Sequence, residues 1–348
     1  MKKMVVIIDY VAGEKMRQFQ EFEKYGFQIE YVYDHPEIQN HDAFSNMFLQ
    51  FEKHGPDSLP VNEDMVKAME DADIVVSHLS AVSSKALRQA KNLDAVCIMR
   101  SGVENVDLKT ADECGVKIVN IPGRLAVPVS EFTIGMMIAE MKNIARSHNR
   151  IRNHNFEVDF VNNSYSWNLA GKAVGLIGCG LVGSRVAKIL KAFDAEVLVF
   201  DPYLGAEKIR EMGCEPVELD ELCERSDVIS VHYRLTDETK GMIGAEQFAK
   251  MKPTCCLINT ARAGLVEEQA LIDALTQRKI GGAALDVFHQ EPLPEGHPFY
   301  TLENVTLTAH LAGTSADIFD VSYRMMRDTI TSYLESGTWS HVVNMRQG

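Results

Sequence analysis

The feature that most constrains the fold of this chain is a glycine-rich turn between a strand and a helix. The apolar run 173–177 leads into Gly178-Cys179-Gly180-Leu181-Val182-Gly183, which has the spacing Gly-x-Gly-x-x-Gly. Gly178 permits a tight turn, Gly180 lets backbone N–H groups approach a pyrophosphate, and Gly183 lets the next helix pack close to the strand. The phosphates are expected at the positive end of that helix. The pattern therefore predicts a dinucleotide-binding fold.

A carboxylate follows the second strand of the same pattern. The apolar run 197–200 ends at Asp201, eighteen residues after Gly183. A carboxylate at this strand tip can accept hydrogen bonds from both adenosine ribose hydroxyls but repels a 2′-phosphate. Because glycines also serve tight turns and close packing elsewhere, the prediction depends on strand, helix, second strand and acid occurring in register. Together they predict NAD, rather than NADP, as the cofactor.

Length and charge indicate two domains and disfavour some classes of partner. The chain has 348 residues, which is more than one ordinary core, and 46% of them are hydrophobic. Its formal net charge of −14 disfavours nucleic acid and anionic membrane surfaces, because both attract positive patches. The apolar run 4–8 is too short for a signal peptide, and no apolar stretch approaches the roughly 20 residues that cross a bilayer. We therefore expect a cytoplasmic protein.

The seven cysteines show no spacing typical of a metal site or a disulfide scaffold. They are odd in number and scattered, apart from the adjacent pair Cys255-Cys256. We expect reduced thiols and no bound metal ion.

Strand and helix patterns alternate along the whole chain, which is typical of α/β folds with parallel sheets. In the first part, strands are expected over residues 4–8, 27–33, 74–77, 96–99 and 117–120. After the glycine-rich turn, further strands are expected over residues 228–232, 256–259, 283–287 and 305–308. A long amphipathic segment from Pro128 to Ile151 is expected to bridge two units.

The predicted fold class is α/β, with two Rossmann-like doubly wound parallel-sheet domains and a cleft between them. Residues 1–121 plus 314–348 would form a discontinuous substrate (catalytic) domain, because a final helix over 319–335 lies beyond the last strand. Residues 122–313 would form the NAD-binding Rossmann domain.

Three polar side chains follow apolar strands, at the sheet edge where ligands bind in such folds. Arg262 stands in Asn259-Thr260-Ala261-Arg262, Glu291 follows Asp286-Val287-Phe288, and His310 begins His310-Leu311-Ala312-Gly313. Taken singly, each has an ordinary explanation as a structural or surface residue. Their joint occurrence after a dinucleotide motif predicts a catalytic site.

With these motifs the chain resembles the D-isomer-specific 2-hydroxyacid dehydrogenase family, in its phosphoglycerate-dehydrogenase-like branch. The resemblance covers essentially the whole chain and implies a catalytic triad of Arg262, Glu291 and His310 in a cleft between the two domains. It implies a homodimer formed through the NAD domain, with the segment after Pro128 as the dimer helix. It also implies that Asp286 contacts the nicotinamide carboxamide.

The chemistry of the side chains supports the same roles. Histidine suits proton transfer in both directions near neutral pH, so His310 is expected to be the base in oxidation and the acid in reduction. A carboxylate bonded to its other ring nitrogen would fix the tautomer, which is the role expected of Glu291. The planar guanidinium of Arg262 matches a substrate carboxylate.

The residues predicted to bind NAD come from the glycine-rich turn and from strand ends. They are Gly178, Gly180, Leu181, Val182, Gly183, Asp201, Tyr233, Arg234, Thr239, Thr260, Ala261, Asp286 and Gly313. Arg234 departs from the family pattern, because most relatives carry proline before the following Leu-Thr. It could stack on adenine, reach a distal anionic group of the substrate, or lie at the surface.

The first domain is expected to select the substrate. Arg100-Ser101-Gly102-Val103 resembles the substrate-binding loop of the family, where backbone N–H groups meet the substrate carboxylate, although it is two residues shorter than the common pattern. The segment His78-Leu79-Ser80 either faces the same site or forms an ordinary loop. Arg124 is a further candidate, and together with Arg100 and Arg234 it suggests a larger or doubly anionic substrate, such as a sugar acid or a phosphorylated acid.

Residues 34–62 form a polar segment longer than a minimal connection between a strand and a helix. The segment could shape a lid over the substrate or a partner surface, and the simpler alternative is a surface insertion.

Two functions of different classes follow from the sequence. The first is an NAD-dependent dehydrogenase acting on a small anionic 2-hydroxy or 2-oxo acid. The second is an NAD(H)-sensing scaffold without significant turnover, like the corepressor relatives of the family. The three candidate catalytic side chains favour the enzyme, but those relatives retain them as well.

Overall fold

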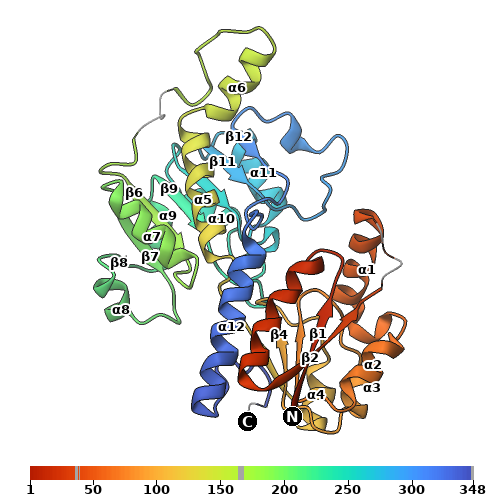
Figure 1. Cartoon of the computed structure of the whole chain (residues 1–348). Coiled ribbons are helices and arrows are strands. Elements are labelled where there is room, and N and C mark those ends of the chain that lie inside the picture. The colour runs from red at the N-terminus through yellow and green to blue at the C-terminus, as the bar shows by residue number, and fades with distance from the viewer. Residues whose placement is uncertain (36–37, 39, 164–167, 346–348) are drawn as a thin grey trace. The chain divides into compact units, whose positions relative to one another are not determined.

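A computed structural model describes residues 1–35, 38, 40–163 and 168–345, and the chain divides into two compact units (Figure 1). Unit 1 comprises Met1–Arg124 with Ala316–Gly348, and unit 2 comprises Leu125–Ser315. The division expected at 121/122 and 313/314 lies within three residues of these boundaries.

Unit 1 is built on a five-stranded parallel sheet with the strand order β2-β1-β3-β4-β5. Its strands are β1 (Lys2–Ile8), β2 (Phe27–Tyr33), β3 (Ile74–Ser77), β4 (Ala95–Ile98) and β5 (Lys117–Asn120). Its helical segments are η1 (Gly13–Tyr25), α1 (His41–His54), η2 (Pro56–Ser58), α2 (Glu63–Met69), α3 (Ser84–Gln89), α4 (Leu108–Cys114) and α12 (Ile318–Ser336).

The central strand β1 shows why this sheet is covered on both faces. Successive side chains of a strand point to opposite faces, and both sets are buried here. Met4 and Val6 pack into one core with η1 and α12, whereas Val5 and Ile7 pack into another with α2, α3 and α4. Figure 1 shows η1 and α12 side by side, although some 300 residues separate them in sequence, and the Tyr323 hydroxyl donates a hydrogen bond to the Gln18 carbonyl at 3.0 Å.

The polar segment 34–62 contains a helix rather than only a loop. α1 begins after Asn40, whose side chain accepts a hydrogen bond from the backbone N–H of Ala43 at 2.9 Å, and η2 follows at Pro56. An asparagine at this position satisfies one of the unpaired N–H groups at the start of a helix, which explains where α1 begins. Residues 36, 37 and 39 of this segment lie outside the described residues.

Unit 2 is built on a seven-stranded parallel sheet with the strand order β12-β11-β10-β9-β6-β7-β8. Its strands are β6 (Ala173–Ile177), β7 (Glu196–Phe200), β8 (Glu215–Pro216), β9 (Val228–Val231), β10 (Cys256–Asn259), β11 (Gly282–Leu285) and β12 (Val305–Leu307). Its helical segments are α5 (Ala126–Met141), α6 (Ile144–Arg152), α7 (Gly183–Ala192), α8 (Ala206–Glu211), α9 (Leu219–Arg225), α10 (Ala245–Lys250), η4 (Ala263–Leu265), α11 (Glu268–Thr276) and η5 (Pro298–Tyr300).

The order of these strands reverses between β6 and β9, which are neighbours in the sheet. Helices α5, α7 and α8 cover one face, and α9, α10 and α11 cover the other. In doubly wound sheets the ligand binds outside the carboxyl ends of the strands at such a reversal. The glycine-rich turn follows β6, and the segment that begins at His232 follows β9, so both lie at this position.

The long segment expected to bridge two units is instead two helices, α5 and α6, that both belong to unit 2. The break lies at Asn143, which has a φ of 57° and so cannot continue the helix. Glu140, fully buried, accepts two hydrogen bonds from the Arg146 guanidinium, at 2.7 and 2.9 Å, and one from the Thr306 hydroxyl at 2.7 Å. Burial raises the pKa of Glu140, and these contacts offset part of that cost.

Candidate functional site

The three glycines of the turn after β6 serve the purposes that their spacing predicts. Gly178 has a φ of 92°, and a Cβ atom there would lie 2.9 Å from the His232 backbone. A Cβ atom on Gly183 would collide with the carbonyl oxygen of Gly178, so the start of α7 lies directly against the turn. A Cβ atom on Gly180 would meet nothing within 4 Å, so the turn is open on that side. This is the space that a pyrophosphate would need.

Asp201 is fixed against the same turn by backbone N–H groups. Its Oδ2 accepts a hydrogen bond from Cys179 N–H at 2.8 Å, and its Oδ1 accepts from Tyr203 N–H and Leu204 N–H at 3.0 and 3.1 Å. A carboxylate has about four acceptor positions, so roughly one remains for a ribose hydroxyl. Hydrogen bonding of this carboxylate to the adenosine ribose, and its repulsion of a 2′-phosphate, stay predictions.

The segment after β9 lies beside the glycine-rich turn and is held by aromatic and hydrogen-bond contacts. Tyr233 is half-buried, with its ring centroid 6.5 Å from that of Phe200 and 6.1 Å from that of Tyr203, and burial raises its pKa to about 12. The buried Thr239 hydroxyl donates to the Arg234 carbonyl at 2.7 Å and accepts from Thr236 N–H at 2.7 Å, so this residue shapes the loop. The Arg234 side chain is exposed and has no ion pair among the described residues.

Hydrogen bonds at the end of β10 fix the backbone of Arg262, the candidate substrate-binding arginine. Asn259, 2% exposed, accepts a hydrogen bond from Ala261 N–H at 3.0 Å and donates one to the Arg262 carbonyl at 3.0 Å. The Thr260 hydroxyl lies 2.7 Å from that of Thr133 on α5. The Arg262 side chain is exposed, and its Nη1 donates to the Ala261 carbonyl at 2.7 Å, so most of its donors stay available for a ligand.

His310 and Glu291 form a hydrogen-bonded pair. His310 Nδ1 lies 2.8 Å from Glu291 Oε2, and Glu291 Oε1 accepts a hydrogen bond from Phe288 N–H at 2.9 Å. His310 has a φ of 53°, an uncommon conformation for a residue with a side chain and one that recurs at functional sites. The imidazole is 49% exposed, and its Nε2 has no hydrogen-bond partner among the described residues. The free nitrogen can therefore exchange a proton with a ligand.

Asp286 directly follows β11, and its carboxylate is bonded within the fold. It is fully buried, its Oδ1 accepts hydrogen bonds from the Thr308 hydroxyl at 2.6 Å and Leu311 N–H at 2.8 Å, and its Oδ2 accepts from Ala312 N–H at 2.8 Å. Both carboxylate oxygens thus have partners within the fold, and the contact with the nicotinamide carboxamide stays a prediction. The carboxylate holds the loop that carries His310, between Thr308 and Leu311.

The candidate substrate loop of unit 1 presents unpaired backbone donors. Among the described residues, the N–H groups of Ser101, Gly102 and Val103 have no hydrogen-bond acceptor. The Ser101 hydroxyl donates to the Ile121 carbonyl at 3.3 Å, and Asn120 Nδ2 donates to the Ser101 carbonyl at 2.5 Å, so the loop is tied to the end of β5. Free N–H groups of this kind can donate hydrogen bonds to a carboxylate, and the chain's own Glu104 carboxylate lies close to Gly102.

Comparison with known proteins gives the family. Residues 134–312 match the model described as "D-isomer specific 2-hydroxyacid dehydrogenase, NAD binding domain". A glyoxylate reductase of Korarchaeum cryptofilum is 31% identical over 287 residues, which are 82% of this chain and 86% of that protein. The chain belongs to the D-isomer-specific 2-hydroxyacid dehydrogenase family. Unit 2 contains its NAD-binding domain, and NAD is the cofactor that this domain takes.

The matches with other members of this family cover different shares of this chain and of the relatives. A D-3-phosphoglycerate dehydrogenase of Methanocaldococcus jannaschii is 35% identical over 285 residues, which are 81% of this chain but 54% of that protein. The chain thus spans about half the length of the phosphoglycerate dehydrogenases that it matches. The crystal structure of D-lactate dehydrogenase with NAD⁺ from Lactobacillus jensenii has a TM-score of 0.76 at 22% identity, covering 98% of this chain and 99% of that one. That likeness concerns the fold, which is the predicted α/β class with two parallel-sheet domains.

Asp9, which the sequence did not single out, pairs with His78 of the segment 78–80 in unit 1. Asp9 Oδ1 accepts hydrogen bonds from Val11 N–H and Ala12 N–H at 2.9 and 2.7 Å, and its Oδ2 accepts from Leu79 N–H at 3.0 Å and lies 3.1 Å from His78 Nδ1. Burial acts to raise the pKa of Asp9, but the His78 and backbone hydrogen bonds hold it below its ordinary value. His78 is 4% exposed and Ser80 is fully buried, so the segment 78–80 serves the interior of unit 1.

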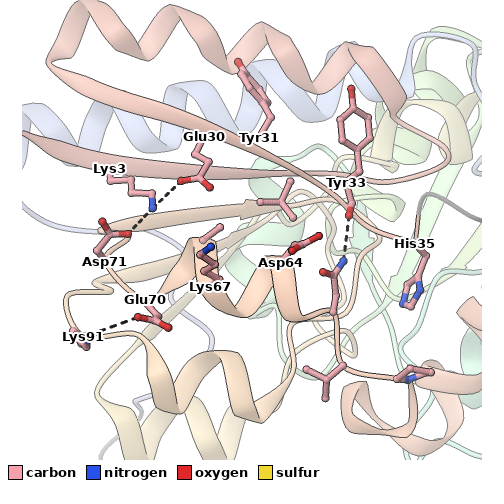
Figure 2. A pocket seen from close by; sticks show the side chains of 15 residues that line it. Lys3, Glu30, Tyr31, Tyr33, His35, Asp64, Lys67, Glu70, Asp71 and Lys91 are labelled. Atoms are coloured by element: carbon pink, nitrogen blue, oxygen red, sulfur yellow. Dashed lines mark hydrogen bonds and ion pairs between the residues drawn. The ribbon is translucent and has the colours of Figure 1, made fainter.

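A large cavity in unit 1 contains none of the predicted site residues. It has a volume of about 1070 Å³ and lies along the edge strand β2 and helix α2 (Figure 2). Lys3 crosses it between Glu30 at 2.8 Å and Asp71 at 2.5 Å, and Lys91 lies 3.7 Å from Glu70. Its charged side chains therefore largely neutralise one another.

Three further observations concern the described residues only. No group of three or more His, Cys, Asp or Glu side chains could hold a metal ion there. None of the helices that the structure describes is long and apolar enough to cross a membrane. All seven cysteines are unpaired thiols, and burial raises the pKa of Cys179, within the glycine-rich turn, to about 12.

Proposed function

We propose that this protein is an NAD-dependent oxidoreductase that interconverts a D-2-hydroxy acid and its 2-oxo acid, with His310, Glu291 and Arg262 as the catalytic residues. The observation that carries the proposal is the hydrogen bond of 2.8 Å between Glu291 and His310 Nδ1, in an NAD-binding domain of this family. Family members named as dehydrogenases and reductases support the reaction class.

His310 is suited to move one proton at Nε2. An ionised carboxylate only accepts hydrogen bonds, so the proton between Glu291 and His310 belongs to Nδ1. Nε2 then takes the hydroxyl proton during oxidation and returns it to the carbonyl oxygen during reduction. The negative charge of Glu291 stabilises the imidazolium that forms, and its bond to Phe288 N–H fixes the direction of the carboxylate. Bound NAD would supply the hydride acceptor, and NADH the donor.

Arg262 and the loop of unit 1 are suited to hold the acid. The exposed guanidinium of Arg262 can form two parallel hydrogen bonds to a carboxylate, and its backbone is fixed by Asn259. The free N–H groups of Ser101, Gly102 and Val103 would bind a substrate carboxylate from unit 1. The names of the relatives, glyoxylate reductase and D-3-phosphoglycerate dehydrogenase, differ in whether the substrate has a second anionic group, so they do not select one acid.

The test is NADH oxidation with a panel of 2-oxo acids, followed by absorbance at the NADH band. We expect turnover on at least one acid, and a loss of about 10²- to 10⁴-fold in kcat for His310→Ala. His297→Gln is a matched control, because His297, directly before η5, also pairs through Nε2 with a glutamate, Glu268 Oε1 on α11, at 3.2 Å. NADH binding without turnover on any acid, or equal losses in the two variants, would contradict the proposal.

A further inference from the structure

Arg124 is a half-buried arginine that has no acidic partner in the part of the chain that the structure describes. It follows β5 in unit 1, and its side chain makes one hydrogen bond, from Nη1 to the Ser322 hydroxyl at 3.2 Å. The Ser322 hydroxyl donates its own proton to the Ile318 carbonyl at 2.7 Å, so it meets the guanidinium as a neutral acceptor. No carboxylate of the described residues lies within ion-pair distance of Arg124. A guanidinium has five N–H donors, and most of these remain for a ligand.

A second arginine adds to the positive charge at this position. Arg100 lies at the end of β4, the neighbour of β5, and its carbonyl accepts a hydrogen bond from Ile121 N–H at 3.1 Å. Its side chain is 12% exposed, and its Nη2 lies 3.8 Å from the exposed Glu104 carboxylate. Burial, and then the like charge of Arg100, lower the pKa of Arg124 to about 10. The Arg124 guanidinium therefore stays charged at neutral pH, although burial and the charge of Arg100 both disfavour its charged form.

A structural arginine elsewhere in this chain, unlike Arg124, pairs with a carboxylate. Arg146, whose side chain is also 12% exposed, donates two hydrogen bonds to the carboxylate of Glu140. The chain carries 49 Asp and Glu residues against 35 Lys and Arg residues, so a partner for Arg124 would be easy to supply. An arginine that is left near another arginine, with a neutral hydroxyl as its partner, is placed for an anion that comes from outside the chain.

The position of the pair fits a substrate. Arg100 and Arg124 follow adjacent parallel strands at their carboxyl ends, where ligands bind in such sheets. The loop that offers free N–H groups, Ser101 to Val103, begins directly after Arg100 and is tied to Asn120 and Ile121. Backbone N–H donors and two guanidinium groups thus occur on one short stretch of unit 1, where the exposed Glu104 carboxylate lies 3.8 Å from Arg100 Nη2.

We propose that Arg124, together with Arg100, binds a second anionic group of the substrate, a carboxylate or a phosphate at the end opposite the 2-oxo acid. The inference rests on the proposed function and deepens it, because it names dianionic 2-oxo acids as the preferred substrate class.

The test compares acids of similar length that differ in the distal group. Oxaloacetate is paired with 2-oxobutanoate, and phosphohydroxypyruvate with hydroxypyruvate, so the two pairs separate a carboxylate from a phosphate as the bound group. We expect the wild type to prefer one dianion, and Arg124→Gln to lower kcat/KM for that dianion about 10- to 100-fold while changing the matched monoanion less than about threefold. Arg124→Lys should restore part of the loss, because it keeps the charge without the planar fork.

Arg88→Gln is the matched control, because it removes the same charge from unit 1. Arg88 lies on α3 and pairs with Glu113 at 2.8 Å at the surface, so its loss should affect dianion and monoanion equally and slightly. Equal losses for the two acids in Arg124→Gln, or a wild type that prefers the monoanions, would overturn the inference. So would a clearly lower unfolding temperature of Arg124→Gln, which would assign the residue to the stability of the fold.

A binding measurement separates failure of this inference from failure of the proposed function. Succinate and inorganic phosphate, with butyrate as the monoanionic reference, are titrated calorimetrically into wild type and Arg124→Gln. A dianion that binds the wild type and loses at least about tenfold in affinity in the variant supports the anion site even if no 2-oxo acid is reduced. Absence of any such difference overturns it, whatever the turnover assay shows.

Discussion

At the scale of single residues, carboxylates at strand ends perform three different tasks in this chain. Glu291 bonds the imidazole of His310, Asp286 bonds the backbone of the loop that carries His310, and Asp201 bonds the glycine-rich turn. Exposure separates them, because Asp286 is fully buried whereas the Glu291 side chain is 37% exposed. Only an exposed oxygen can touch a ligand, so the same residue type is a catalytic candidate in one place and a positioning residue in another.

Asp201→Asn tests the preference for NAD over NADP. The variant removes the charge that repels a 2′-phosphate but keeps one oxygen for the N–H groups of Tyr203 and Leu204. We expect the ratio of kcat/KM for NADPH to that for NADH to rise about 10- to 100-fold. Asp273→Asn, on the exposed side of α11, is the control for the charge change and should leave the ratio unchanged. An unchanged ratio in Asp201→Asn would contradict the role of this carboxylate.

At these strand ends the sequence predicts the local turn geometry but not the contacts that each carboxylate makes within the fold. The spacing of Gly178 to Gly183 defines a local turn, so its geometry follows from the residues themselves. The task of Asp286 depends on the register of β11 and β12, where Leu285 pairs with Leu307. That register brings the carboxylate to Thr308 and to the N–H groups beyond it. No local pattern carries this information, because the contacts join residues 22 to 26 positions apart.

At the scale of elements, buried polar contacts decide where helices and loops end. The segment from Pro128 to Ile151 predicts one long helix, but Asn143 in a left-handed conformation divides it into α5 and α6. The Arg146 guanidinium on α6 donates a hydrogen bond to the Glu140 carboxylate on α5, on the other side of that break. In unit 1, Asp9 joins the loops after β1 and β3 through three backbone N–H groups and His78. Such tertiary pairings could not be predicted from the periodicity of either strand.

Asp9→Asn should destabilise unit 1 and change its response to acid. The folded pKa of Asp9 lies below its ordinary value, so its contribution is complete at neutral pH and is lost as the pH falls through the folded pKa. We expect the variant to lose about 2–3 kcal/mol of unfolding free energy at pH 7 and to differ less from the wild type in acid. Urea unfolding at several pH values measures this difference.

Asp71→Asn provides the comparison for Asp9→Asn. Asp71 is an exposed carboxylate that pairs with Lys3, and removal of an ion pair with an exposed partner has only a small effect on stability. If Asp9→Asn were no more destabilising than Asp71→Asn, the buried Asp9–His78 pair would have no special part in the stability of unit 1.

At the scale of the whole molecule, the apolar surface of unit 2 bears on how the chain assembles. Helix α6 has no buried residue and extends from the end of α5 away from the sheet (Figure 1). Ile144 and Ile151 on this helix are 54% and 48% exposed, and Phe156 and Val158 beyond it are 84% and 71% exposed. Apolar side chains gathered on one projection usually mark a surface that another protein covers. We propose that a second copy of the chain covers it, as the resemblance to the family implies.

If the chain forms this homodimer, its mass in solution should be twice that of one chain, and charged substitutions in the interface should separate the two copies. The chain has a mass of 38.9 kDa, so light scattering after gel filtration should give about twice that value for the wild type. Phe156→Asp combined with Val158→Asp should shift the mass toward 38.9 kDa, because two charges would then replace apolar contacts in the interface. Tyr25→Asp, at an exposed aromatic on η1 of unit 1, should leave the mass unchanged. A wild type that elutes as a monomer, or a double variant that keeps the doubled mass, would show that this projection serves another purpose.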